Sequence, residues 1–161
     1  MTVVSDAGPL IALARIGALN LLPGVYGDIV IPVAVRDEIR KPDRKRPGTV
    51  SFANADWLRT ESVSNQSTRR LLHDNLDAGE REAIALAIEL EAGVLLIDEA
   101  LGRRVADSHG RTITGTLGVL LLAKEEDLIE AVAPVVDRLV STGFRIGDAL
   151  YQSILEQAGE P

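Results

Sequence analysis

The sequence predicts an α/β fold in which helices flank a central, mostly parallel β-sheet. Short apolar segments typical of buried strands alternate with segments of helical periodicity, and this alternation favours parallel strands joined by helices. The chain has 161 residues, of which 46% are hydrophobic and 25% charged, so it can fold around a substantial core. Because only 3% of the residues are aromatic, that core must consist of Ala, Leu, Ile and Val.

Five segments are predicted to be strands. Each is a short run with apolar residues, and turn-forming or helical segments separate one from the next. The five ranges, in chain order, are 2–5, 28–31, 57–63, 94–97 and 111–114.

Helices are predicted between and after these strands. The strongest covers 79–92, where Ala83, Ile84 and Ala87 follow helical spacing and Gly93 ends the helix. Another begins at Pro32, at a position where the missing N–H of proline is harmless. The remaining predicted helices cover 7–16, 20–22, 49–55, 68–75, 99–109, 117–125 and 128–141.

The sequence predicts one domain over 1–161. It contains no repeat and no linker, and its C-terminal helix, 147–158, is expected to pack on the domain or on a dimer mate. The absence of cysteine excludes disulfides and thiolate metal sites. No apolar run approaches the about 20 residues of a membrane helix, and the N-terminus does not resemble a signal peptide. We therefore expect a cytoplasmic protein with no membrane association.

Four carboxylates stand where predicted strands or helices begin or end. Asp6 follows the first strand and Asp98 ends the apolar run of the fourth. Glu80 opens the strongest helix, and Glu38 lies in the helix that follows the second strand. In a parallel sheet Asp6 and Asp98 would lie at the carboxyl edge, where open α/β sheets place their ligand crevice. Clustered carboxylates without thiols favour a hard divalent cation such as Mg²⁺ or Mn²⁺.

Each carboxylate also has a purely structural interpretation. Asp6 and Asp98 could cap the helices that follow them. The residues 77–80 have the form of a capping box with Glu80 at its third helical position. Glu38 could be an ordinary solvated helix residue. The sequence alone leaves these alternatives open, although several acids at one edge are more than helix capping requires.

Two neighbouring residues are candidates for supporting roles. Glu99 is either a further acid at the metal site or a first-turn residue favoured by the helix dipole. Thr116 either caps the helix that it begins or reaches the site with its hydroxyl. Asp37 and Glu82 are near neighbours of the proposed ligands Glu38 and Glu80. On a helix their side chains point about 100° away from the ligands, so we place them on the surface or behind the site.

The charge pattern bears on possible nucleic-acid binding. The net charge of −7 disfavours a polyanionic partner. The segment 36–47, however, holds six basic and three acidic residues, a net charge of +3. It could hold a phosphate backbone beside a metal-neutralised acidic pocket, or it could be a solvated loop. The candidate contacts are Arg40, Lys41, Arg44, Lys45 and Arg46, followed by Arg69, Arg70, Arg103 and Arg104.

Five short sequence motifs follow one another along the chain, at 4–11, 76–83, 96–99, 115–120 and 143–146. Together they resemble the PIN-domain family of metal-dependent nucleases, and most closely the VapC-like toxins of toxin–antitoxin pairs. The resemblance implies a three-layer sandwich. It also implies catalytic roles for Asp6, Glu38, Glu80 and Asp98, with Asp6, Glu80 and Asp98 as metal ligands and Glu38 and Glu99 as further possible ligands.

Two departures from the family pattern affect the metal site. Glu80 stands where other PIN domains often have Asp, which lengthens the ligand by one methylene. Glu99 stands where relatives often carry a second Asp. Both leave open whether one or two ions bind.

The resemblance implies an endoribonuclease that cuts single-stranded or loop RNA with Mg²⁺ or Mn²⁺. It further implies a type II toxin that forms a homodimer and is blocked by a small antitoxin. The alternative is an inert PIN-like module that binds RNA or protein. A phosphotransfer receiver or phosphatase of similar topology is disfavoured, because residues 7–9 lack the second Asp that common aspartate phosphatases use.

Overall fold

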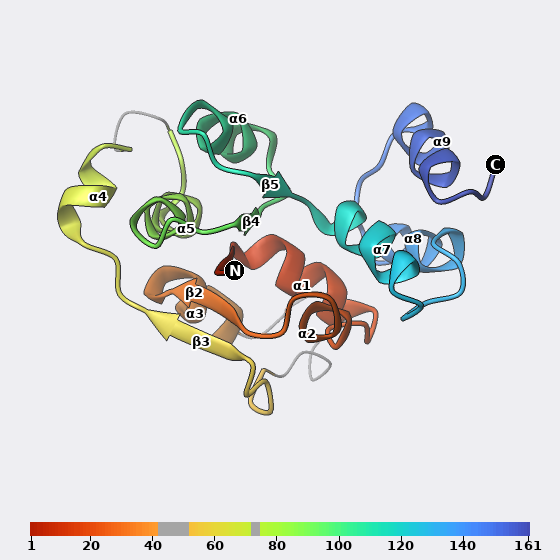
Figure 1. Cartoon of the computed structure of the whole chain (residues 1–161), viewed down its shortest axis with the longest axis horizontal. Coiled ribbons are helices and arrows are strands. Elements are labelled where there is room, and N and C mark those ends of the chain that lie inside the picture. The colour runs from red at the N-terminus through yellow and green to blue at the C-terminus, as the bar shows by residue number, and fades with distance from the viewer. Residues whose placement is uncertain (42–51, 72–74) are drawn as a thin grey trace.

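A five-stranded sheet forms the centre of the molecule in the computed structural model, which describes residues 1–41, 52–71 and 75–161 (Figure 1). The strand order is β3-β2-β1-β4-β5, and every pairing is parallel. The predicted parallel α/β sheet is therefore confirmed. The strands are β1 (Val3–Ser5), β2 (Ile29–Pro32), β3 (Leu58–Glu61), β4 (Val94–Leu96) and β5 (Ile113–Thr114).

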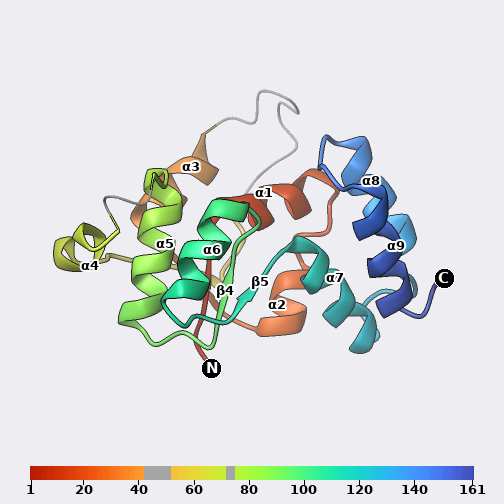
Figure 2. The same ribbon diagram turned by 90° about the horizontal axis from the view of Figure 1, so that it is seen from above.

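Helices cover both faces of this sheet. In Figure 2, α5 and α6 lie on one side of the strands and α2 and α7 on the other, which confirms the predicted three-layer sandwich. The helices in the described residues are α1 (Ala7–Arg15), α2 (Leu21–Tyr26), α3 (Val33–Arg40), α4 (Asn65–Arg69), α5 (Ala78–Glu89), α6 (Ala100–Ser108), α7 (Thr116–Glu125), α8 (Ala133–Ser141) and α9 (Asp148–Gln157).

The sheet reverses its order at β1. After β1 the chain crosses to β2 on one side, and it later returns to β4 on the other side. Ser5 is in register with Leu96, and the backbone N–H of Asp6 donates to the Leu96 carbonyl at 2.8 Å. The carboxyl ends of β1 and β4 therefore meet at a switch point, the place where open α/β sheets bind their ligands.

The core is aliphatic, as the composition predicts. The buried hydrophobic side chains of the described residues are all Ala, Val, Leu or Ile. Helix α5 illustrates the packing, because its Ala83, Ala85 and Ala87 are fully buried and α5 contacts β1, β2 and β4. Small side chains let this helix lie close to the sheet, which brings its first turn to the carboxyl edge of the strands.

Three predicted helices differ from the structure. The helix predicted over 49–55 is wrong for 52–55, which form turns, and 49–51 lie outside the described residues. The helix predicted over 68–75 instead begins at Asn65, because the Ser64 hydroxyl oxygen accepts a hydrogen bond from the Ser67 N–H, and it ends at Arg69. The helix predicted over 128–141 begins only at Ala133, with Pro134 in its first turn.

A carboxylate near the C-terminus links the last three helices. Glu160 accepts hydrogen bonds from the backbone N–H groups of Val132 and Ala133 at 2.8 and 3.1 Å, which caps α8. Its Oε2 also accepts from Lys124 Nζ of α7 at 2.8 Å. Because Glu160 follows α9 directly, this cluster, which we call the C-terminal latch, fixes α9 against α7 and α8.

Among the described residues, none of the helices is both long and apolar enough to span a membrane.

Candidate active site

Asp6 lies directly after β1 and is only 5% exposed. It occupies the N-cap position of α1, yet its side chain makes no capping hydrogen bond, so helix capping does not explain its carboxylate. The pKa of Asp6 is raised to about 7, mainly by burial. A hydrogen bond from the Ala7 backbone lowers this pKa, and the negative charges of Asp77, Glu80 and Glu38 raise it. Asp6 is thus an acid held in a negatively charged, largely dry position.

Gly79 leaves room for three carboxylates to converge. A β-carbon at Gly79 would lie 3.3 Å from Glu38 Oε2, 3.4 Å from Asp6 Oδ1 and 3.5 Å from Asp77 Oδ1. These acids come from α3, from the end of β1 and from the residue before α5. We call this group of carboxylate oxygens around Gly79, from Asp6, Glu38 and Asp77, the Gly79 cradle.

Glu80 forms the capping box that its sequence predicts. Its backbone N–H donates to Asp77 Oδ1 at 2.8 Å, and its Oε1 accepts from the Asp77 N–H at 3.2 Å. Its other oxygen, Oε2, lies 3.1 Å from the point where a β-carbon on Gly102 of α6 would stand. Burial raises the pKa of Glu80 to about 7, and the charges of Asp77 and Glu99 add to this effect. Capping therefore uses one oxygen of Glu80 and holds the other between α5 and α6.

Glu38 is an exposed residue of α3 whose carboxyl group faces the cradle. Partial burial of that group raises its pKa, the charge of Asp77 raises it further, and Lys41 opposes both. The helix that carries Glu38 is tied to α5, because the backbone N–H of Ala34 donates to Glu82 Oε1 at 3.2 Å. Glu82, which the sequence places behind the site, thus positions the helix that carries Glu38.

Asp98 is oriented by Thr116 and does not cap α6, whose N-cap is Glu99. The Thr116 backbone N–H donates to Asp98 Oδ1 at 2.7 Å, and the Thr116 hydroxyl donates to Asp98 Oδ2 at 2.6 Å. Thr116 is fully buried, so the two contacts are sheltered from water. Asp98 Oδ2 also lies 3.7 Å from the position of a β-carbon on Gly8, which places the acid against the first turn of α1.

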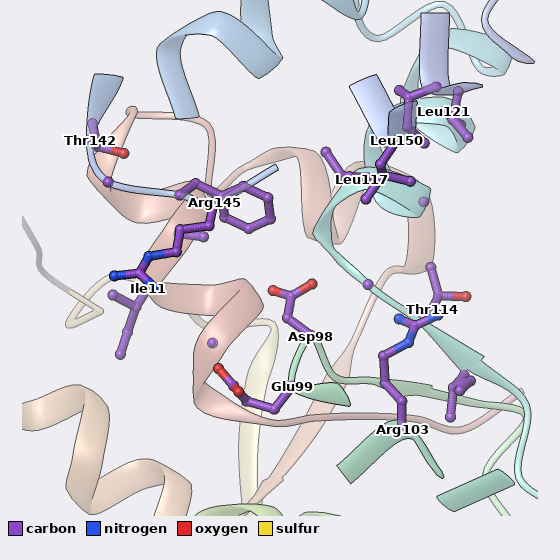
Figure 3. Close-up of a pocket in the computed structure, with 18 of the residues that line it drawn as sticks. Ile11, Asp98, Glu99, Arg103, Thr114, Leu117, Leu121, Thr142, Arg145 and Leu150 are labelled. Carbon is purple, nitrogen blue, oxygen red and sulfur yellow. The ribbon is translucent and has the colours of Figure 1, made fainter. Parts of the chain in front are cut away.

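A pocket of about 870 Å³ opens beside Asp98 (Figure 3). Asp98 and the exposed Glu99 contribute acidic groups to its lining, and Arg15, Arg103 and Arg145 contribute cations. Arg103 is held in place because its Nη1 donates to the Ile97 carbonyl at 3.1 Å. Sequence reasoning included Arg145 only in the motif at 143–146 and gave it no role, and it treated Arg103 only as a reserve contact, because no local pattern places the loop after α8 near β4.

The structure divides the predicted acids into two neighbouring groups. Asp6, Glu38 and Glu80 gather around the start of α5, together with Asp77, which sequence reasoning read only as a cap. Asp98 and Glu99 line the pocket, together with Gly8. In the described ranges, no three Asp, Glu or His side chains already stand in an arrangement that would hold a metal ion.

The segment 36–47, which we call the basic strip, begins close to these acids. Arg40 and Lys41 are exposed at the end of α3, and Lys41 is near enough to Glu38 to lower its pKa. Arg44, Lys45 and Arg46 lie outside the described residues.

The fold and site together define a class: a parallel α/β protein with buried acids at the carboxyl edge of its sheet. The chain belongs to the PIN-domain family. The matching family model, DUF3368, is described as a PIN domain and covers residues 2–160. PIN domains are generally nucleases, so the chain has a nuclease fold suited to hydrolysis of nucleic acids. No curated protein and no solved structure shows a significant match.

Proposed function

We propose that this PIN domain is a divalent-metal-dependent endoribonuclease and the toxin of a type II toxin–antitoxin pair. The observation that carries the proposal is the burial of Asp6 and Glu80 beside further negative charge, with both pKa values raised to about 7. Burying like charges together destabilises a protein unless the acids take up protons or a cation neutralises them. A structural role alone does not explain why so many acids share this edge.

The donor groups fit Mg²⁺ or Mn²⁺, since hard cations prefer carboxylate oxygens. The Gly79 cradle supports this fit, because a side chain at that position would fill the space between three carboxylates. When bound, such an ion supplies a water of lowered pKa and a positive charge for the phosphate. The proposed ligands are Asp6, Glu80 and Asp98, with Glu38 and Glu99 as further candidates.

Each proposed ligand is held in place by a different feature of the structure. Asp6 is immobilised by burial at the end of β1, Glu80 by the capping box, and Asp98 by the two donors of Thr116. Fixed ligands reduce the reorganisation that metal binding and phosphate attack require. We therefore assign Thr116 a positioning role behind the metal site.

The RNA backbone would be held by cations near the acids. Arg40 and Lys41 are exposed beside Glu38, and the candidates Arg44, Lys45 and Arg46 follow them in the chain. Contacts of this kind give affinity without sequence information. RNA as the substrate rests on the resemblance to VapC-like toxins.

The proposed partners are a small antitoxin that blocks the acidic site and a second copy of the chain. Both rest on the same resemblance. The side chain of Val140 on α8, 46% exposed, is a candidate for the dimer contact. Light scattering at several concentrations tests the dimer, and a small reading frame next to the gene would support the antitoxin.

The test of the enzymatic proposal is RNA cleavage with a matched pair of variants. We expect wild-type protein to cut single-stranded RNA with Mn²⁺ and to stop when chelator is added. Asp6→Asn should abolish cleavage, whereas Asp37→Asn, an exposed acid that pairs with Arg36, should retain it. Equal cleavage by Asp6→Asn, purified free of host nucleases, would contradict the proposal.

The second candidate is an inert PIN-like module that binds RNA or protein. The observation in its favour is that each oxygen of Asp98 already accepts one hydrogen bond from Thr116, which leaves fewer lone pairs for a metal ion. This candidate predicts RNA or protein binding with no cleavage in Mg²⁺ or Mn²⁺. Metal-dependent turnover that is lost in Asp6→Asn decides against it.

A further inference from the structure

We propose that the pocket beside Asp98 seats one unpaired nucleobase of the RNA strand. The inference deepens the proposed function and rests on it, because it takes a nucleic acid as the substrate. The pocket lies between α1, α7, α9 and the loop that joins α8 to α9 (Figure 3). Its volume of about 870 Å³ falls within the range of about 300–1,000 Å³ that is typical of small-ligand sites.

One end of the pocket is charged. In the view of Figure 3, Asp98 and Glu99 lie between Arg103 and Arg145. A polyanion approaching two acids alone would be repelled, and the two arginines offset that repulsion. Guanidinium groups bind phosphate oxygens with two parallel hydrogen bonds, so this end suits the backbone on either side of a nucleotide.

The other end of the pocket is apolar. Leu117, Leu121 and Leu150 converge there (Figure 3), and Leu150 remains 48% exposed. An apolar chamber next to cations and a candidate metal site matches the two parts of a nucleotide, a flat base and an anionic phosphate. A purely electrostatic groove for the backbone would not require these leucines.

An aromatic residue also lines the pocket. Phe144, one of only two phenylalanines in the chain, lines the pocket and directly precedes Arg145. Gly143 follows the C-cap of α8, Thr142, and its φ of 102° is a conformation that favours glycine. Aromatic rings and guanidinium planes are the groups on which unstacked RNA bases usually rest.

The chemistry of the lining determines what the pocket can distinguish. The Thr142 hydroxyl, which also lines it, already donates to the Leu139 carbonyl at 2.8 Å. Thr114 and Gln157 are the other uncharged polar side chains of the lining. The leucines and Phe144 supply stacking and apolar contact, which tolerate any base that is free to leave its helix. The pocket accordingly selects unpaired RNA over duplex and discriminates weakly among the four bases.

The experiment is a scan of RNA binding with abasic sites. A fluorescent 12-nucleotide RNA carries one abasic site at each position in turn, and its affinity is measured by anisotropy in Mn²⁺ on the Asp6→Asn background. We expect one position at which loss of the base weakens binding by roughly 5- to 150-fold, the effect of one stacked base. The other positions should change little.

Two variants connect that position to the pocket. Phe144→Ala and Leu150→Ser should each weaken binding of the intact RNA and remove most of the penalty at the special abasic position. Leu128→Ser is the matched control, since Leu128 is similarly exposed, at 42%, but does not line the pocket. We expect Leu128→Ser to bind the intact RNA as tightly as the Asp6→Asn protein does. It should also show the same loss of affinity at the special abasic position.

The outcomes separate this inference from the proposed function. A flat scan, or an unchanged penalty in Phe144→Ala and Leu150→Ser, overturns the nucleobase assignment and favours a protein segment as the occupant, even where wild-type protein cleaves RNA. Absence of both RNA binding and RNA cleavage overturns the two proposals together.

Discussion

Thr116 holds both oxygens of Asp98, one through its backbone N–H at 2.7 Å and one through its hydroxyl at 2.6 Å. The pair connects the end of β4 to the start of α7, so a residue 18 positions away decides how Asp98 faces the site. The Thr116 hydroxyl serves the acid, and Thr116 is the first residue of α7, whose N-cap is Gly115.

Removing the hydroxyl of Thr116 should weaken the site. Thr116→Val leaves Asp98 Oδ2 without its donor in a sheltered position, which we expect to cost about 1–3 kcal/mol of unfolding free energy. Mn²⁺ affinity by calorimetry should also fall, whereas Thr116→Ser should restore it. Equal Mn²⁺ affinity in the Val and Ser variants would refute the positioning role.

Filling the Gly79 cradle should separate metal binding from stability. Gly79→Ala places a methyl group 3.3 Å from Glu38 Oε2, which must shift by a few tenths of an ångström, and in contact with Asp6 Oδ1 and Asp77 Oδ1 at 3.4 and 3.5 Å, so it occupies the space between these oxygens. Alanine in a helix is favoured over glycine by about 1 kcal/mol, so metal-free stability should hold or rise. Mn²⁺ affinity should drop at least several-fold. A variant that binds Mn²⁺ as tightly as wild type would remove the cradle from the metal site.

The metal-free protein should become less stable as the pH rises. Folded Asp6 keeps its proton up to about pH 7, whereas the unfolded chain releases it near 3.8. Between these values the folded state binds more protons, so the free energy of unfolding falls from about pH 4 to 7, by a few kcal/mol at most. Glu80 acts in the same direction.

Urea unfolding in chelator across this pH range measures the effect. Asp6→Asn should flatten the slope, because asparagine carries no proton to lose, and it should be more stable than wild type at pH 8. A wild-type slope of the opposite sign would show that Asp6 is not buried in solution.

The C-terminal latch should contribute to stability. Hydrogen bonds from Lys124 and from the backbone of Val132 and Ala133 lower the pKa of Glu160 to about 2. Its stabilising effect is thus present at neutral pH and is lost only as the pH falls below about 4 toward 2. We expect Glu160→Gln to lower the Tm by a few degrees, whereas the exposed neighbour Glu156→Gln should not. Identical Tm values for the two would argue against the latch.

Neutralising the basic strip should weaken RNA binding across all sequences. For Arg40→Gln with Lys41→Gln, the slope of log K against log salt should flatten by roughly 0.7 per lost contact on single-stranded RNA. Mn²⁺ affinity should change little for Arg40→Gln alone, since exposed charges are screened over about 10 Å, whereas loss of Lys41 also removes the charge that lowers the pKa of Glu38. Arg59→Gln on the edge strand β3 serves as the control. An unchanged salt slope would assign the strip to solvent or to the antitoxin.

Much of this architecture could be predicted from the sequence because its signals are local. The apolar runs predict the strands, and residues 77–80 predict the capping box that the structure contains. Asp6 and Asp98 could be placed at one edge, because parallel strands share the direction of their carboxyl ends.

The remaining features depend on contacts between distant residues. The start of α8 depends on Glu160, which lies 28 residues beyond the Val132 that it caps. The Gly79 cradle depends on how closely α3, β1 and α5 approach, and the pocket depends on the loop after α8 folding back to Asp98. No local pattern of residue types encodes such distances.

The central claim is that these acids hold a divalent cation at the carboxyl edge of the sheet. Anomalous diffraction from crystals grown with Mn²⁺ tests it most directly, because the signal locates the ion independently of activity. The account predicts a peak bounded by Asp6, Glu80 and Asp98 that is lost in Asp6→Asn. A map with no peak among these side chains, at Mn²⁺ concentrations that support RNA cleavage, would contradict it.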